Sequence, residues 1–403
     1  MKTSAIIAPS VLLIICLIGF PQISETIYSP ALPNIASGLA TTSALTQWTM
    51  SIYFVGFALG VLYWGRLSDR IGRRPVMLLG IVVYGCANLG CLLSPSIEIL
   101  LLSRLIQAFG ASVGSVITLT IAREAFADSS RHKLFSTIGA ALSLTPALGP
   151  FIGGYVSDWF GWRANFTVLI IMTLLLLVYT WCRLPETKPN HPPQHVPMKI
   201  GKACLLLIRD KHVLGCAWII GAINGILFGY YTEAPFIFIR LLDISPGTYG
   251  WLGIFIGSAS MLGSMLSRRL GRSFTGKQIS KLGCLIMLIS NLILCAFVWA
   301  GWITPEHIVL SILLIMLPMA GLILGSCSLI IPVIMGTALN QYKEILGTAS
   351  ALFGLAYYVL IAGFTWFMGV IHNETLFPMP FYFLALSISI AATYYYIDQK
   401  KPT

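Results

Sequence analysis

The sequence predicts an all-α membrane protein with twelve transmembrane helices in two six-helix halves. Its composition, its succession of apolar segments and the distribution of its basic residues predict this class. Of the 403 residues, 57% are hydrophobic and only 10% are charged, and the mean hydropathy is +0.85. Because a soluble domain carries roughly a quarter charged residues, most of the surface of this chain must face lipid.

Twelve apolar segments follow one another along the chain, most of them separated by short polar stretches. A helix of about 20 apolar residues crosses the hydrocarbon core of a bilayer. No cleavage region follows the first segment, so we interpret it as an uncleaved helix and not as a signal peptide. We expect helices at residues 5–24, 46–64, 75–94, 99–122, 134–156, 164–182, 213–239, 248–267, 279–301, 308–331, 346–371 and 380–397.

The basic residues predict the orientation of these helices. If the N-terminus lies inside, nearly all of the 25 Lys and Arg residues fall in inner loops; only Arg163 and Arg240 fall outside, and Arg104 lies within a helix. By the positive-inside rule, both termini are expected in the cytoplasm. As a separate expectation, the membrane is a bacterial inner (plasma) membrane. The net charge of +11 is then a topology signal, and we expect no nucleic-acid partner.

A proline-rich polar stretch, residues 184–211, divides the chain into an N-terminal half, residues 1–183, and a C-terminal half, residues 212–403. We interpret this stretch as a cytoplasmic linker that ends in a short amphipathic segment. An internal repeat supports the division, because GRLSDRIGR follows the second apolar segment and SMLSRRLGR follows the eighth. Two parallel repeats with a substrate site between them are a known transporter architecture.

Four motifs together resemble the major facilitator superfamily. GRLSDRIGRR (65–74) is similar to its loop signature between helices 2 and 3, and RLIQAFG (104–110) to its helix 4 motif. GPFIGG (149–154) is similar to its helix 5 antiporter motif, and LPET (184–187) to its exit from helix 6. Residues 29–33 and 347–352 further resemble the Bcr/CflA-type drug:proton antiporters. We accordingly expect a monomeric transporter without a cofactor, a metal site or catalytic residues.

The first helix departs from the Bcr/CflA pattern. Members of that group resemble one another in having an aspartate four residues before the proline that corresponds to Pro30. In the present sequence Thr26 occupies that position, and the acid is Glu25, one residue earlier. A step of one residue turns a helix by about 100°. Either the longer side chain of Glu25 reaches the cavity, or the proton site has moved. The helix 5 motif also lacks its first glycine, which is Thr145 here.

Two motifs are expected to control movement of the halves. The gating motif comprises Gly65, Asp69, Arg70, Gly72 and Arg73. The Asp69 carboxylate can accept charge-assisted bonds from the surrounding arginines, so the loop is expected to act as a latch at the cytoplasmic end; otherwise it is a plain basic loop. The antiporter motif comprises Gly149, Pro150, Gly153 and Gly154, in which Pro150 breaks the helical ladder and the glycines permit close helix contact.

Glu25, Arg104 and Glu233 are the candidates for proton coupling, because an ionisable group inside a membrane costs at least about 2.5 kcal/mol. The rise of a helix places Glu25 and Arg104 in the outer half of the bilayer. Glu233 lies nearer the outer surface, where it could be interfacial. We expect Glu25 to carry the proton and Arg104 to tune its ionisation.

Polar and aromatic residues are expected to line a cavity between the halves, although aromatic residues also face lipid. Such a wall suits an amphipathic or cationic organic compound. The expected wall residues are Tyr28, Tyr53, Gln107, Asn224, Phe228, Tyr231 and Tyr357.

The sequence thus predicts a proton-coupled secondary active transporter that exports small organic compounds, drugs or metabolites, by alternating access. The same fold permits a proton symporter that imports a metabolite or chelate. A non-transporting membrane sensor is the alternative from another class and would need an added signalling domain. An intramembrane enzyme would need a nucleophile–base pair or a metal cluster in its spans, and the sequence shows none.

Overall fold

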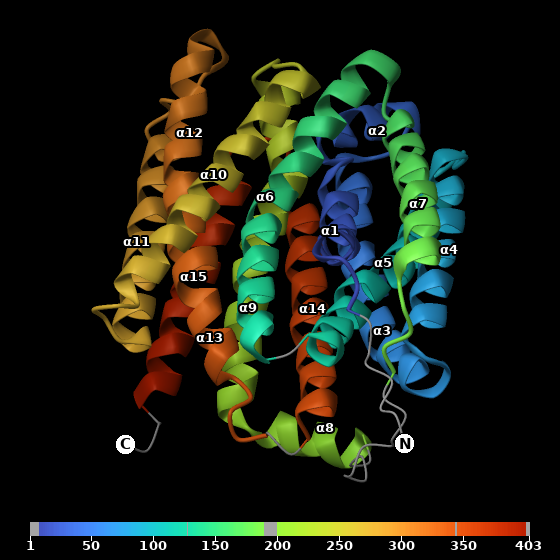
Figure 1. Ribbon diagram of the computed structural model, residues 1–403. Helices are drawn as coiled ribbons and strands as arrows, with labels where there is room; N and C mark the ends of the chain where they lie inside the picture. Colours follow the sequence, from blue (N-terminus) through green and yellow to red (C-terminus); the bar gives the residue numbers. More distant parts are fainter. Residues whose placement is uncertain (1–7, 127, 189–199, 343–344, 400–403) are drawn as a thin grey trace, which may run out of the picture.

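The computed structural model describes residues 8–126, 128–188, 200–342 and 345–399, and the regular structure in this part of the chain is helical (Figure 1). Eleven segments of it are long and apolar enough to cross a membrane. The one expected helix that is not among them, residues 134–156, lies within α6 (Asp128–Phe160). The predicted all-α membrane fold is therefore confirmed.

Between the first and the last span, nine spans are each a single helix or a helix with one short extension. These are α3 (Ser43–Ile71), α4 (Arg73–Leu92), α5 (Ile97–Ala125), α6, α7 (Ala164–Arg183), α9 (Lys211–Pro235) with η2 (Phe236–Leu241), α10 (Pro246–Leu270), α11 (Gly276–Trp299) and α14 (Leu346–Ile371). The span before α14 is composite, with η3 (Pro305–His307), α12 (Ile308–Ile323), η4 (Leu324–Ile330) and α13 (Ile331–Thr337), and α15 (Pro378–Gln399) ends the bundle. η2 and η4 are π-helical turns.

The first span is longer than the sequence predicted, and this changes the position of Glu25 along it. The helices α1 (Val11–Thr26), η1 (Ser29–Ala31) and α2 (Leu32–Gly38) form one apolar segment. They do so because Pro30 is the second residue of η1 and Pro33 is the second residue of α2. In the first turn of a helix a missing backbone N–H costs nothing. Glu25 therefore lies near the midpoint of this apolar segment, nearer to its centre than the sequence predicted, and its position in the outer half of the bilayer stays a prediction.

One further helix, α8 (Ile200–Arg209), lies across one end of the bundle (Figure 1). It buries Ala203 and Leu207 against the bundle and exposes Leu206 and Ile208, as the predicted amphipathic segment should. Exposed apolar side chains on such a helix suit the bilayer interface. We call this end of the bundle the α8 end and the opposite end, where α2 lies, the α2 end (Figure 1).

Helices that precede the linker meet helices that follow it along two interfaces, α3 with α14 and α6 with α10. At the α2 end, polar contacts join helices from before the linker to helices from after it. The contacts include Ser29 Oγ to the Tyr231 carbonyl, Gly247 N to Asp158 Oδ2 at 2.7 Å, and Trp251 Nε1 to the Tyr155 hydroxyl at 2.9 Å. The exact limits of the two halves stay a prediction.

Candidate functional site

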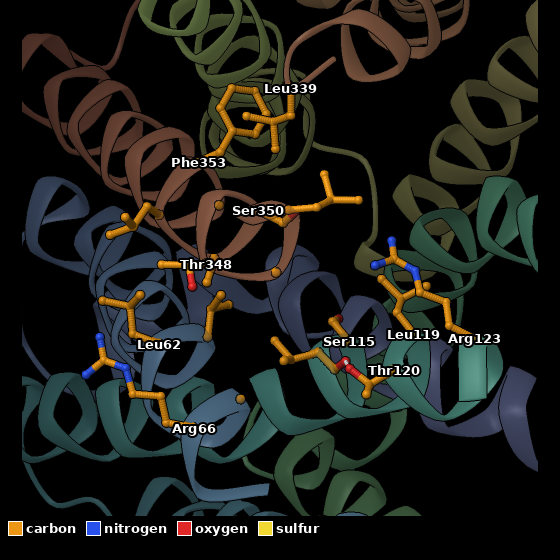
Figure 2. Close-up of a pocket in the computed structure, with 18 of the residues that line it drawn as sticks. Leu62, Arg66, Ser115, Leu119, Thr120, Arg123, Leu339, Thr348, Ser350 and Phe353 are labelled. Atoms are coloured by element: carbon orange, nitrogen blue, oxygen red, sulfur yellow. Dashed lines mark hydrogen bonds between the residues drawn. The ribbon is translucent and has the colours of Figure 1, made fainter. Parts of the chain in front are cut away.

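A cavity of about 1460 Å³ opens at the α8 end, between α3 and α5 on one side and α13 and α14 on the other. Its rim is charged, because Arg66, Asp69 and Arg70 end α3 there and Arg123 and Glu124 end α5. Figure 2 shows Arg66 and Arg123 on different helices that border the same space. Its inner part is aromatic, with Phe57, Phe353, Tyr357 and Tyr358 from the middle of α3 and α14.

Of the seven expected wall residues, only Tyr357 is among the residues that line this cavity. Asn224 bonds to the carbonyl of its own helix at Ile220, at 2.9 Å. The other five are buried in the packed region toward the α2 end: Tyr28, Tyr53, Gln107, Phe228 and Tyr231. The closed α2 end explains this burial, because it presses aromatic side chains of the two parts together; the rings of Phe54 and Phe228 are 4.5 Å apart.

Sequence reasoning missed most of the wall that α5 provides. Ser115, Leu119, Thr120 and Arg123 line the cavity and follow one another at helical spacing. A stripe of polar residues on an otherwise apolar helix was the signal that could have identified them.

Arg104 is fully buried between two aromatic rings. Its guanidinium carbon lies 4.0 Å from the ring centre of Tyr28 and 4.3 Å from that of Tyr53, within cation–π distance of both. Its Nη1 donates to the Ser24 carbonyl at 3.4 Å and to Gln107 Oε1. Its Nε and Nη2 have no hydrogen-bond partner in the described part of the chain. Part of the donor capacity of this cation is therefore unused in the present state.

Glu25 faces the same region from α1. It is 6% exposed and lies within electrostatic range of Arg104 and of the cavity tyrosines Tyr357 and Tyr358. Thr26, where the Bcr/CflA pattern has its aspartate, instead donates from Oγ1 to the Pro146 carbonyl of α6, at 3.2 Å. The one-residue step therefore directs position 26 to a neighbouring helix and position 25 toward Arg104 and the inner end of the cavity.

Glu233 is fully buried within the protein, near the α2 end, and its depth in the membrane stays a prediction. Its Oε2 accepts a hydrogen bond from Gln47 Nε2 at 2.7 Å, and both of its carboxylate oxygens lie 2.9 Å from His372 Nδ1. Gln47 belongs to α3 and Glu233 to α9, so this contact joins helices from the two sides of the linker. Sequence reasoning found no signal for His372, which lies one residue beyond α14.

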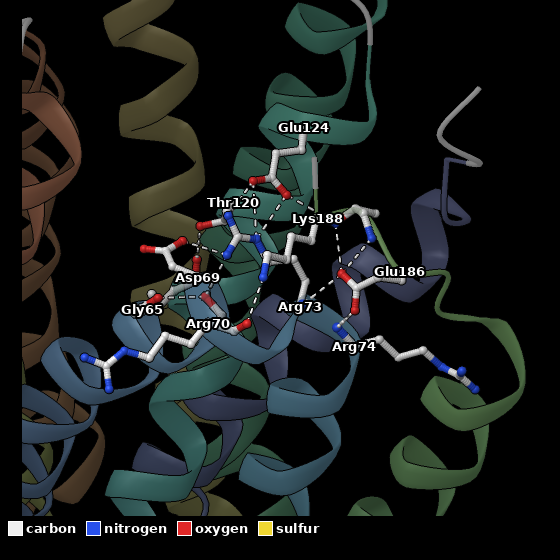
Figure 3. A network of polar contacts seen from close by, with 12 residues as sticks. Gly65, Asp69, Arg70, Arg73, Arg74, Thr120, Glu124, Glu186 and Lys188 are labelled. Carbon is white, nitrogen blue, oxygen red and sulfur yellow. Dashed lines mark hydrogen bonds and ion pairs between the residues drawn. The ribbon is translucent and has the colours of Figure 1, made fainter. Parts of the chain in front are cut away.

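The gating motif is held by an arginine at the centre of an acidic cluster (Figure 3). Arg73 Nη1 pairs with Asp69 Oδ1 at 2.7 Å, and its Nη2 pairs with Glu124 Oε1 at 2.7 Å. Glu186 accepts the backbone N–H groups of Arg73 and Arg74 and so caps the N-terminus of α4. The cluster ties α3, α4 and α5 to the segment after α7, all before the linker.

Gly72 and the two glutamates explain the spacing of this motif. Gly72 has a φ of 106° and joins α3 to α4. A Cβ there would lie 3.0 Å from the carboxyl carbon of Glu186, so glycine is required both for the turn and for the cap. Sequence reasoning placed Glu124 among the acids of loops, helix ends or termini and missed its role, because its pairing with Arg73 arises only in the folded chain.

The antiporter motif packs α6 against two different helices. A Cβ at Gly149 or Gly153 would collide with Thr26 or with the Ile27 carbonyl of α1. A Cβ at Gly154 would collide with the Pro246 carbonyl of α10. Pro150 packs against Gly253 of α10, where an added Cβ would lie 3.1 Å from the Pro150 Cβ. The motif therefore provides close packing on one side within the N-terminal part and on the other side across the interface.

No group of three His, Cys, Asp or Glu side chains that could hold a metal ion occurs among the described residues. The arrangement offers a large cavity open at one end, buried ionisable groups in the packed part of the bundle and closed contacts at the other end.

Comparison with known proteins identifies the family. The Major Facilitator Superfamily profile matches residues 14–365. The chain is 37% identical over 397 residues to an uncharacterized transporter of Rickettsia bellii, covering 96% of this chain and 95% of that protein. It is 26% identical over 388 residues to a bicyclomycin resistance protein homolog of Haemophilus influenzae, covering 94% of each.

A solved structure of a D-xylose-proton symporter has the same fold, with a TM-score of 0.76, 16% identity and coverage of 97% of this chain and 98% of that one. The matching family and relatives are transporters and not enzymes. The resemblance of the four sequence motifs is therefore confirmed, and the chain belongs to the Major Facilitator Superfamily.

Proposed function

We propose that this transporter exports small organic compounds in exchange for protons, with Glu25 as the proton-binding group and Arg104 as the cation that tunes it. The burial of Glu25 at the midpoint of its span, within electrostatic range of Arg104 and of the cavity tyrosines, carries this proposal. A carboxyl group in that position can exchange its proton in a state that admits water to it, and movement of the neighbouring cation changes how firmly the proton is held.

The cavity supports an organic substrate. Its volume of about 1460 Å³ exceeds that of a usual ligand pocket. Its inner end offers aromatic rings, and its rim offers both Arg and acidic side chains, so an amphipathic compound can find apolar and polar contacts at once. The resemblance to a bicyclomycin resistance protein homolog makes bicyclomycin the first compound to test.

We further propose that the α8 end faces the cytoplasm of a bacterium and that the protein acts as a monomer. Arg66, Arg70 and Arg123 gather at that end, as the positive-inside rule requires. The present state would then be open to the cytoplasm and ready to take up its compound from inside.

The test measures the pH inside proteoliposomes that contain the pure protein and an entrapped pH-sensitive dye. Both sides start at equal pH, and bicyclomycin is added outside. Exchange makes the lumen more alkaline, because protons leave as the compound enters, whereas a symporter makes it more acidic. The sign of the change therefore separates the export proposal from the symporter alternative, and no change with any of a panel of amphipathic compounds would contradict both.

Glu25→Gln is the matched variant, because it keeps the shape of the side chain and removes its proton chemistry. We expect compound-driven proton movement to vanish while compound binding survives. Full proton exchange by this variant would refute the assignment of Glu25.

A further inference from the structure

A second buried acid–base pair lies at the closed α2 end, away from Glu25. The side chains of Glu233 and His372 are 1% and 4% exposed, and His372 Nδ1 faces the middle of the carboxylate, 2.9 Å from each oxygen. Gln47 donates to the same carboxylate from across the interface at 2.7 Å. The pair thus accepts a bond that can exist only while α3 and α9 are held together.

The second nitrogen of His372 makes this pair a candidate for binding a proton or a water molecule. His372 Nε2 is buried and has no hydrogen-bond partner among the described residues. Glu233 and His372 border a cavity of about 170 Å³, which has room for several waters. An unpartnered polar atom beside a polar cavity is otherwise costly, by about 1–3 kcal/mol.

The surroundings leave the charge of the pair uncompensated. Arg240 and Glu374 are the other charged residues on this cavity, and they pair with each other at 2.9 Å on its exposed side. From α3 the pair meets the neutral Gln47, and from η2 the ring of Phe236 lies 5.1 Å from the His372 ring. Nothing among these groups supplies a cation to Glu233 except His372 itself.

Electrostatics then link the protonation of the pair to closure. With a neutral imidazole the pair carries a net charge of −1, and with an imidazolium it is an ion pair of net charge zero. A net charge is far more costly to bury than a paired one. The closed, dry state therefore favours the additional proton, whereas an open state would expose the pair to water that solvates either form.

We propose that Glu233 and His372 together form a second proton-binding site, which takes up one proton when the α2 end closes and releases it when that end opens. The proposal rests on the proposed proton-coupled function and adds a gate on which the proton gradient acts. A low pH on the α2 side holds the gate closed, and a high pH lets Gln47 separate from Glu233.

The test measures the distance between two spin labels across the α2 end, at Ser37→Cys in α2 and Thr248→Cys in α10, both exposed positions. The full-length protein, with its native cysteines replaced, is studied in lipid nanodiscs from pH 5 to pH 9. We expect the open-to-closed ratio to rise with pH, by at most tenfold per pH unit, which is the limit for one proton. If the ratio stays constant with pH in the labelled protein that keeps Glu233, His372 and Gln47, the proposal is overturned. This measurement does not depend on the folding of any variant of those three residues.

Variants assign the effect to the pair. Glu233→Gln and His372→Asn should each remove the pH dependence. Glu374→Gln, on the same cavity, and His307→Asn, at an exposed position, should keep it. Gln47→Met should raise the open fraction at every pH and keep the slope. A pH response in Glu233→Gln and His372→Asn equal to that of the parent protein overturns the proposal.

Failure of this inference can be told apart from failure of the proposed function. Glu25→Gln leaves the pair intact, so it should keep the pH-dependent opening while losing proton exchange in proteoliposomes. If proton exchange depends on Glu25 but opening ignores pH, the function stands and the gate is refuted.

Discussion

Glu124→Gln should destabilise the protein more than Asp69→Asn, although Asp69 and not Glu124 belongs to the recognised motif. Both carboxylates contact Arg73 at 2.7 Å, but the Glu124 side chain is 17% exposed and the Asp69 side chain 71%. Glu124 also accepts from Arg73 Nε at 3.2 Å and from Thr187 Oγ1 at 3.2 Å. A shielded bond to a charged group contributes about 1.5–3 kcal/mol, whereas an exposed ion pair contributes about 0.2–1 kcal/mol.

Double-mutant cycles with Arg73→Ala measure each coupling. Unfolding is followed in mixed micelles of increasing SDS content by thiol labelling, since the free cysteines Cys91, Cys284 and Cys295 are buried in the folded protein. We expect a coupling free energy of about 2 kcal/mol for Arg73 with Glu124 and below about 1 kcal/mol for Arg73 with Asp69. Equal couplings, or a larger one for Asp69, would refute the reasoning from burial.

Three further predictions concern transport. Asp69→Asn should slow turnover and leave compound affinity within a few-fold, because the Asp69 carboxylate is already paired with Arg73 at 2.7 Å; a large loss of affinity at unchanged turnover would contradict a gating role. Arg104→Lys should retain only part of the exchange activity and Arg104→Ala none, because lysine keeps the charge but lacks the planar group that lies between Tyr28 and Tyr53. If Arg104→Lys and the parent protein exchanged at equal rates in proteoliposomes at matched protein levels, the planar group would be dispensable. Gly154→Ala should raise the open fraction in the spin-label measurement, since its Cβ meets the Pro246 carbonyl, whereas Gly139→Ala on the same helix has open space and should not; a normal closed fraction in Gly154→Ala would show that the two helices can separate without cost to closure.

The fold was predictable because it depends on properties that are summed over many residues. Lipid exposure follows from the low content of charged residues, and the number of spans follows from the succession of apolar segments. The position of Glu25 along its span was not predictable in the same way, because it depends on whether Pro30 and Pro33 end a helix or begin one. Prolines in the first turn of a new helix extend the span, and a hydropathy pattern cannot distinguish that from a loop.

The partners of the buried charges were also beyond the sequence. The sequence identified Glu233 as an acid in an apolar segment, but Gln47 and His372 come from distant parts of the chain and only the tertiary fold brings them together. The state of the protein limited the cavity in the same way. Tyr28, Tyr53 and Phe228 are buried here because the α2 end is closed. The expected wall residues therefore include side chains that this state buries together with Tyr357, which it leaves on the open cavity.

The proposed proton site and the interface between helices are joined through three consecutive residues at the C-terminal end of α1, the last of which, Ile27, caps the helix. Glu25 faces Arg104, while the next two residues, Thr26 and Ile27, pack on Gly149 and Gly153 of α6 without space for a methyl group between them. The opposite side of α6 lies equally close to α10 at Gly154. Because packing this close leaves little freedom for α1 and α6 to slide, a shift of α1 driven by the charge of Glu25 must move α6 and so disturb its contact with α10. The antiporter motif would then serve coupling by keeping these contacts rigid, which explains why glycines, and not flexible side chains, stand at its positions.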